Sequence, residues 1–247
     1  EHGFDVDIPH WWGPGPAGSY VAPWKFPDEL DFDPAVPNEH IEDRMADEAC
    51  AFLEANKDKS FFLNYWAFSV HGPWDGKKTL IEKYAAKADP KNPQRLPVYG
   101  AMVESLDDAV GQLLDTLDRL KLSDNTIVVW TSDNGPEAAV GWQGTAGFWR
   151  GSYFTALEGS LRTSFLIRWP GKIEPGSVSN EIVHITDILP TFARVAGYKV
   201  PDDREIDGVD QLDFFLGKQK RSNREGFPIY LGETLSAYKW RNWKVHF

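Results

Sequence analysis

The feature that most constrains this chain is an apolar run that ends in a carboxylate and an amide. Residues 126–134 read TIVVWTSDN, a composition typical of a buried strand, and the breakers Gly135 and Pro136 follow. In an α/β sheet, ligands bind beyond the carboxyl ends of the strands, so Asp133 and Asn134 are placed to offer oxygens to a cation or an anionic substrate. An Asx turn that ends the strand explains the same pattern. The run by itself leaves both interpretations open.

Size and charge limit the classes of protein to which the chain can belong. With 247 residues and 42% hydrophobic content, it is long enough for one large domain, or for one domain plus part of another. It carries 26 basic and 37 acidic side chains, a formal charge of −11, which disfavours nucleic acid and anionic membranes as partners. No apolar run approaches the ~20 residues that cross a bilayer. We therefore expect no nucleic-acid partner and no membrane partner.

Both ends of the sequence have the character of a piece of a longer protein. Residues 1–5 read EHGFD, without an initiator methionine or the charged and apolar parts of a secretion signal. Residues 239–247 alternate like a strand and then stop. We expect a fragment or a processed product.

Hydrophobic periodicity predicts two successive units of helix and strand. Residues 1–37 are rich in proline, glycine and tryptophan and are expected to form a loop. Apolar positions at helical spacing predict helices at 39–57 and at about 98–120. The near-continuous apolar stretch 61–68 and the run from Thr126 are typical of buried parallel strands. Short connections between such units favour a mostly parallel sheet covered by helices.

The remaining elements are shorter. A strand is expected at 163–169, followed by a helix at about 187–195 that Gly197 ends. A short strand at 228–231 and a last one near Trp243 complete the predicted elements.

A histidine follows the predicted strand at 61–68. The segment after it reads SVHGPW, which puts His71 on a turn. If this strand and the Thr126 strand are parallel neighbours, His71 and Asp133 lie at the same edge of the sheet. An imidazole suits proton transfer near neutral pH, but a lone histidine on a turn is also common on protein surfaces.

Four blocks in order along the chain resemble the sulfatase family, the formylglycine-dependent sulfuric ester hydrolases of the alkaline phosphatase superfamily. Each block is weak alone, but together they are colinear over nearly the whole chain. Residues 206–209 and 241–244 are also similar, and residues 2–5 resemble the stretch that follows the family's first catalytic half. The four blocks are VHGP at 70–73, SDNG at 132–135, EGSLR at 158–162 with WPGKI at 169–173, and DILPT at 187–191.

The resemblance implies an α/β fold with a mostly parallel sheet flanked by helices, as in alkaline phosphatase. The sheet would be incomplete at its N-terminal side. Residues 1–197 would be the second part of the catalytic domain, with 1–37 as its loop-rich opening segment. Residues 198–247 would be the connection to, and the beginning of, a small C-terminal sheet subdomain.

The resemblance also assigns roles to individual residues. Asp133 and Asn134 match the family's metal-binding pair, which holds Ca²⁺ or, in some members, Mg²⁺. This agrees with the residues themselves, because hard cations take carboxylate and amide oxygens, although Ca²⁺ needs about six to eight of them. His71 matches the histidine that contacts the sulfate and assists proton transfer.

Four residues in or shortly before the third block are candidates for substrate binding or for a structural role. The family has a lysine five positions before the glutamate of this block, whereas this chain has Tyr153, a neutral donor. Arg150 is the nearest cation that could replace the lysine, so Arg150 and Tyr153 are candidate substrate-binding residues. Glu158 and Arg162, four positions apart, are expected to form a structural pair.

The family's nucleophile is a cysteine or serine converted to formylglycine within a Cys/Ser-x-Pro-x-Arg motif. This chain has no such motif, and the resemblance places the formylglycine in the missing N-terminal half, so the isolated chain is expected to be inactive. The intact enzyme would hydrolyse a sulfated small molecule or a sulfated carbohydrate and would be periplasmic or secreted. The alternatives are a phosphonate or phosphodiester hydrolase of the same superfamily and a non-catalytic binding homologue, which Tyr153 in place of lysine supports.

The eleven tryptophans raise the possibility of stacking against sugar rings. The alternative is that most of them pack in the core or at its rim. The candidates on loops are Trp11, Trp12, Trp74, Trp142 and Trp149.

Overall fold

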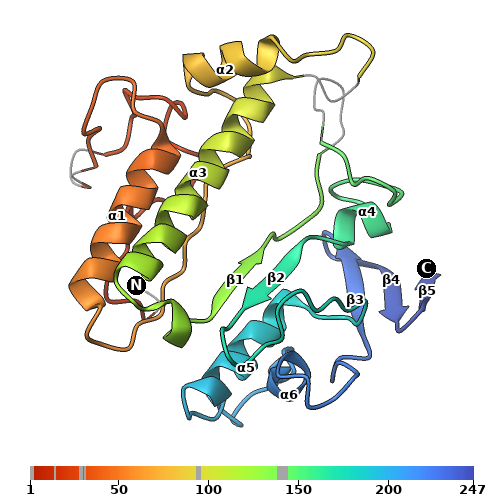
Figure 1. Cartoon of the computed structure of the whole chain (residues 1–247). Coiled ribbons are helices and arrows are strands. Elements are labelled where there is room, and N and C mark those ends of the chain that lie inside the picture. The colour runs from red at the N-terminus through yellow and green to blue at the C-terminus, as the bar shows by residue number, and fades with distance from the viewer. Residues whose placement is uncertain (1–2, 14, 28–29, 31, 93–95, 138–143) are drawn as a thin grey trace. The chain divides into compact units, whose positions relative to one another are not determined.

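The computed structural model describes residues 3–13, 15–27, 30, 32–92, 96–137 and 144–247 (Figure 1). The chain divides into two compact units, Glu1–Ser123 and Asp124–Phe247, and each is treated by itself. Among the candidate residues above, Trp142 lies outside the described ranges. The boundary predicted at residue 197 concerns a different division, between a catalytic domain and a small subdomain, and stays a prediction.

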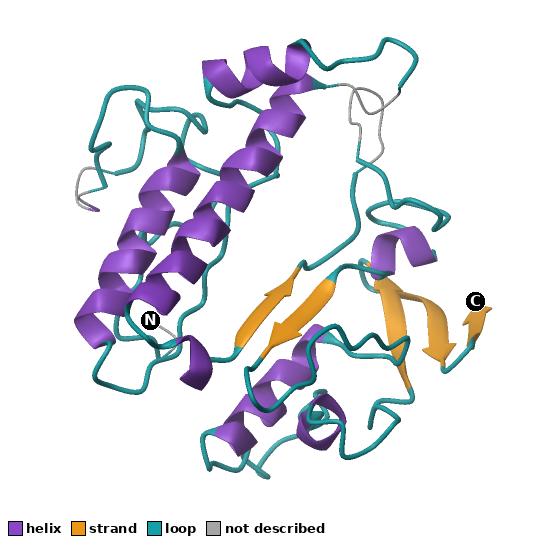
Figure 2. Cartoon of the chain, in the orientation of Figure 1, coloured by secondary structure: helices purple, strands orange, loops and turns teal. Residues whose placement is uncertain are grey.

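Three helices form the frame of the first unit. They are α1 (Ile41–Asn56), α2 (Lys78–Ala85) and α3 (Pro97–Arg119). The helices α1 and α3 pack side by side and confirm the two predicted helices (Figure 2). The helix α2 packs on α3 but buries no residue, which explains why its sequence carries no apolar stripe. None of the helices in the described ranges combines the length and apolar character that a bilayer crossing requires.

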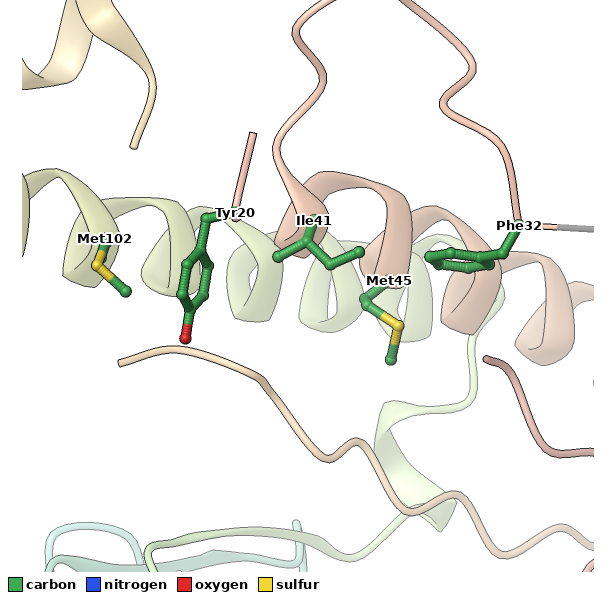
Figure 3. Packing of buried hydrophobic residues seen from close by; sticks show 5 residues of the cluster. All are labelled: Tyr20, Phe32, Ile41, Met45 and Met102. Carbon is green, nitrogen blue, oxygen red and sulfur yellow. The ribbon is translucent and has the colours of Figure 1, made fainter. Parts of the chain in front are cut away.

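The core of this unit is supplied partly by the long opening loop. Tyr20 and Phe32, both from that loop, pack with Ile41 and Met45 of α1 and Met102 of α3 (Figure 3). Further aromatic side chains surround this cluster. The segment 1–37 is therefore irregular, as predicted, but it contributes to the core rather than merely covering the surface.

The buried parallel strand predicted at 61–68 is not formed. Residues 61–68 do not form a strand, and the exposure of their side chains alternates: Phe62 is 54% and Trp66 78% exposed. A strand requires a hydrogen-bonded neighbour, and within the described ranges this segment has no ladder partner. The sequence pattern indicates an extended backbone, but it does not specify what the backbone pairs with.

The second unit contains two antiparallel sheets. In the first, β1 (Val128–Thr131) pairs with β2 (Phe165–Arg168), with Thr131 opposite Phe165. The second has the order β3 (Gly226–Leu231), β4 (Thr234–Trp240) and β5 (Trp243–His246). The strands at 128–131 and 165–168 were expected, but as members of a mostly parallel sheet. The three strand ladders in the described part of the chain are all antiparallel. The expected direction was wrong because alternation and composition predict strands and not how they pair.

Short helices complete the second unit. The 3₁₀ helix η2 (Ser123–Asn125) leads into it, and α4 (Glu158–Leu161) lies between β1 and β2 in sequence. The 3₁₀ helix η3 (Ile185–Asp187) runs into α5 (Ile188–Val195), and α6 (Leu212–Phe215) follows. Helix α5 ends just before Gly197, which has a φ of 81°, as the sequence predicts.

A buried carboxylate joins three segments of this unit. Asp187 is 1% exposed and accepts the backbone N–H groups of His184 and Val209 at 3.0 and 2.9 Å. The guanidinium of Arg224 lies 2.6 Å from its Oδ1, and the Gln211 amide donates to its Oδ2 at 3.1 Å. Burial alone would raise the pKa of Asp187, but the hydrogen bonds from Arg224 and the two backbone groups outweigh burial and lower it.

We predict that Asp187→Asn lowers the free energy of unfolding by about 3 kcal/mol at pH 7, because it leaves the buried Arg224 guanidinium without its charge partner. The folded-state pKa is lowered, so the contribution of Asp187 is complete above its unfolded pKa of about 3.9 and is lost as the pH falls through the folded value. The difference between the two proteins should shrink below about pH 4. Urea unfolding between pH 2 and 7 measures it.

Asp203→Asn is the matched control, because Asp203 pairs with Arg204 but is exposed. Exposed pairs contribute about 0–1 kcal/mol. Equal losses for the two variants at neutral pH would contradict the role assigned to Asp187.

Candidate functional site

The predicted ligand pair lies on the turn that follows β1. Asp133 is exposed and Asn134 is half-buried. Within the described residues, the Asp133 carboxylate accepts one long bond, 3.5 Å from Ser132 Oγ, and the Asn134 amide donates to the Gly135 carbonyl at 3.0 Å. An Asx turn would require a backbone N–H bonded to one of the side-chain oxygens, and no described backbone group provides it. Among the described residues, no backbone group occupies the two carboxylate oxygens of Asp133 or the amide oxygen of Asn134, so these oxygens can face a ligand.

Three glycines hold a second segment against this turn. The Gly135 amide donates to the Ser160 carbonyl at 2.7 Å, and the Gly159 amide donates to the Arg150 carbonyl at 2.8 Å. A Cβ on Gly135 would lie 1.9 Å from the Gly159 oxygen, and one on Gly159 would lie 2.2 Å from the Gly151 oxygen. These backbones can approach so closely only because they lack side chains. The contact brings residues 150–160 beside the Asp133 turn.

Arg150 and Tyr153 are carried on this segment. The Tyr153 amide donates to the Pro136 carbonyl at 2.9 Å, which ties the segment to the Asp133 turn a second time. The Tyr153 side chain is 43% exposed. Arg150 is exposed, and its guanidinium has no carboxylate partner among the described residues. Phe154, 64% exposed, adopts a φ of 59°, a conformation that bulky residues rarely take outside constrained sites.

Glu158 is the centre of a charge cluster that the sequence did not fully predict. Lys244 Nζ lies 2.5 Å from its Oε1 and Lys239 Nζ 3.6 Å, whereas the expected partner Arg162 lies at 3.9 Å. Lys244 also donates to the Ala156 carbonyl at 3.1 Å. Partial burial would raise the pKa of Glu158, but the hydrogen bond from Lys244 and the surrounding positive charges lower it. Lys244, 86 positions away in sequence, was not predicted as a partner.

His71 lies in the first unit, on the turn after residues 61–68. Its ring is exposed, and its Nδ1 is 2.6 Å from the Gly72 carbonyl. A carbonyl can only accept, so Nδ1 carries the proton of this hydrogen bond and Nε2 is the nitrogen left for a reactant. Because Asp133 belongs to the other unit, the juxtaposition of His71 and Asp133 stays a prediction.

The tryptophan candidates separate into core and surface residues. Trp74 packs against the core of the first unit and meets Tyr99 edge-on at 5.3 Å. Trp11 stacks on Trp12, which is 90% exposed. The Arg162 guanidinium lies 4.1 Å from the ring centroid of Trp149. One face of Trp149 therefore holds a cation already, which weakens the case for a sugar ring there.

The donor chemistry of the turn fits part of a site for a hard cation. Asp133 offers carboxylate oxygens and Asn134 an amide oxygen, the ligand types that Ca²⁺ and Mg²⁺ prefer. Within the described ranges, no group of three or more His, Cys, Asp or Glu side chains gathers in a way that could hold a metal ion. The two residues can therefore supply some of the ligands and not a complete shell.

We predict that Gly135→Ala lowers the free energy of unfolding by about 3 kcal/mol or more, because the new Cβ would overlap the Gly159 carbonyl. The same change at Gly111, in the interior of α3, should be neutral or stabilise by up to about 1 kcal/mol, because no atom beyond its chain neighbours and its own helix backbone lies within 4 Å of the Cβ position. Thermal or urea unfolding followed by circular dichroism compares the two. Gly135→Ala at wild-type stability would show that the backbones do not approach this closely.

The sequence of this chain is similar to known proteins of one family. The family model described as Sulfatase matches residues 7–198. The steryl-sulfatase of Rattus norvegicus is 37% identical over 80% of this chain and 34% of its own length. The arylsulfatase H of Homo sapiens is 32% identical over 86% of this chain and 38% of its own length. The N-acetylgalactosamine-6-O-sulfatase of Bacteroides thetaiotaomicron is 31% identical over 84% and 40%. The chain thus spans roughly a third to two fifths of these relatives.

Solved structures agree with the sequence comparison. The structure of Ps i-CgsB in complex with k-i-k-neocarrahexaose matches with a TM-score of 0.74 and 25% identity, over 86% of this chain and 47% of that one. The PsFucS1 sulfatase from Pseudoalteromonas sp. matches with a TM-score of 0.68 and 30% identity, over 87% and 43%. These neighbours confirm the expected α/β fold class. With a family model that extends over residues 7–198, the chain belongs to the sulfatase family.

Proposed function

We propose that the complete protein containing this chain hydrolyses the sulfate ester of a sulfated carbohydrate. The observation that carries the proposal is the close contact of Gly135 with Gly159, which brings the Asp133–Asn134 turn near the backbone of Arg150. Arg150 is exposed and has no carboxylate partner among the described residues. A sulfate ester needs both kinds of group, a site for a cation and a positive side chain. The carbohydrate is supported by the N-acetylgalactosamine-6-O-sulfatase relative and by the neighbour solved with a neocarrahexaose.

In this proposal, different residues of the chain would bind the cation, bind the sulfate and transfer a proton. Asp133 and Asn134 would hold the cation, which when bound draws electron density from the sulfuryl oxygens. Arg150 would bind a sulfate oxygen through its guanidinium, as a charge-assisted donor. His71, whose Nδ1–H is engaged by the Gly72 carbonyl, would act in its doubly protonated form: its Nε2 proton would pass to the oxygen of the departing alcohol and leave a neutral imidazole. The family's nucleophile, formylglycine, has no counterpart among the 247 residues.

A phosphodiester or phosphonate hydrolase is the second candidate, because it would use a similar cation and a similar anionic substrate. The sulfatase relatives favour the sulfate ester. Assays of the complete protein with matched aryl sulfate and aryl phosphodiester substrates separate the two. Mass spectrometry for the formylglycine aldehyde tests the non-catalytic alternative. A higher kcat/KM for the phosphodiester, or an unmodified nucleophile with no turnover, would overturn the proposal.

We predict that Asp133→Ala in the complete protein lowers kcat/KM for a sulfated oligosaccharide by about 100-fold or more, because it removes a charged ligand of the cation. Chelation by EDTA should cause a similar loss that added Ca²⁺ or Mg²⁺ reverses in the wild-type protein. Calorimetric titration with each cation measures the binding directly. Asp203→Ala, which removes an exposed carboxylate remote in sequence, should leave both quantities unchanged. Full activity of Asp133→Ala would remove this residue from the site.

Arg150 and Tyr153 can be distinguished by paired substitutions. We predict that Arg150→Ala raises KM by about 10-fold or more, since a hydrogen bond to a charged group contributes about 1.5–3 kcal/mol. Tyr153→Phe, which removes a neutral donor, should raise KM by less than about 10-fold. Arg204→Ala is the control, because Arg204 is exposed and pairs with its neighbour Asp203. A larger effect of Tyr153→Phe than of Arg150→Ala would assign sulfate binding to the tyrosine.

A further inference from the structure

The turn that presents His71 is held by buried side chains from segments far away in sequence. Tyr20, 0% exposed, donates from its hydroxyl to the carbonyls of Phe68 and His71 at 2.6 and 2.7 Å. Figure 3 shows this hydroxyl directed away from the helices, toward the backbone that runs past it. The Trp74 indole donates to the Val70 carbonyl at 3.2 Å. The His71 ring itself stays exposed.

Glu42 completes this arrangement from within α1. Its side chain is 0% exposed. Its Oε1 accepts the backbone N–H of Ser69 at 2.7 Å, and its Oε2 accepts the Tyr65 hydroxyl at 3.0 Å. The Glu42 carboxylate thus holds the backbone two residues before His71 and also binds the side chain of Tyr65, six residues before His71.

A carboxylate is an expensive group to bury for packing alone. Taking it out of water is costly unless partners compensate, and apolar side chains of similar volume often serve stability as well or better. Burial raises the pKa of Glu42, and the hydrogen bonds from Ser69 and Tyr65 oppose this shift. The backbone amide of Ser69 is a donor that an apolar residue at position 42 could not satisfy.

We propose that Glu42 is a positioning residue for His71: its buried carboxylate, together with the Tyr20 hydroxyl, fixes the backbone of residues 68–72 and so the direction of the exposed imidazole. This rests on the proposed function, in which His71 transfers a proton to the departing alcohol. Proton transfer is sensitive to such direction, since a displacement of about 1 Å can cost about 100-fold in rate.

The first test follows His71 in the complete protein, without any requirement for activity. Glu42→Gln, Glu42→Ala and Tyr20→Phe should speed amide hydrogen exchange at Ser69 and His71, and should broaden or split the His71 Cε1–Hε1 NMR signal. Leu53→Ala is the control, because Leu53 is buried in the same helix α1 at 2% exposure but makes no contact with the turn in the hydrogen-bond network above. An unchanged His71 signal in Glu42→Ala and Tyr20→Phe would overturn the proposal.

The second test measures kinetics in the complete protein. Tyr20→Phe and Glu42→Ala should lower kcat by about 10- to 100-fold and leave KM within about 2-fold, since they act on the proton-transfer group and not on sulfate binding. Glu42→Gln, which keeps an acceptor for the Ser69 amide, should recover part of the loss. A fall in kcat that only follows the folded fraction, as expected for Leu53→Ala, would show a structural role and overturn the proposal.

The two tests separate this inference from the proposed function. If the NMR signal of His71 changes as expected but the wild-type complete protein has no sulfatase activity, the sulfatase assignment fails while Glu42 still positions His71. If the wild-type protein is active and the variants retain its kcat, the positioning role fails while the sulfatase assignment stands.

Discussion

The second unit depends on a contact between backbones that only glycine allows. Gly135 follows the Asp133–Asn134 turn directly, and a Cβ there would lie 1.9 Å from the Gly159 carbonyl oxygen. Because a side chain at either position would separate the two segments, the contact sets how far Arg150 and Tyr153 lie from the turn. The arrangement is fixed by backbone geometry and hydrogen bonds, so it does not depend on the exposed Asp133 and Arg150 side chains that we propose as ligand-binding groups.

The fold could be predicted in part, and the limits have physical causes. Helices α1 and α3 were predicted because their apolar stripes repeat at the period of the helix itself, which is a local property. Helix α2 buries no side chain, so no stripe marked it. Strands β1 and β2 were predicted as strands, but their antiparallel pairing depends on a neighbour about 37 positions away, which periodicity does not encode.

The candidate site shows the same division between local and distant information. Asp133 and Asn134 became candidates because they follow a predicted strand, and His71 because it follows an extended apolar segment. The distant contacts around the candidate residues were not predicted: Tyr20 donates to the His71 carbonyl across 51 positions, and Lys244 donates to the Ala156 carbonyl, beside Glu158, across 88. Such contacts follow from tertiary packing, and a single sequence gives no sign of them.

Tyr153 stands where the sulfatase family has a lysine, so another side chain would have to supply the positive charge. The chain has a net charge of −11, so an anionic substrate needs a local positive group. Lys244 cannot serve, because it is 11% exposed and is bonded to Glu158 and to the Ala156 carbonyl. Arg162 lies over the ring of Trp149 and near Glu158. Arg150, on the segment that Gly159 holds against the Asp133 turn, is exposed and has no carboxylate partner in the described ranges. We therefore propose that the Arg150 guanidinium, on the same loop, takes the place of the family's lysine, because it can bind two oxygens of one sulfate where an ammonium acts as a point charge.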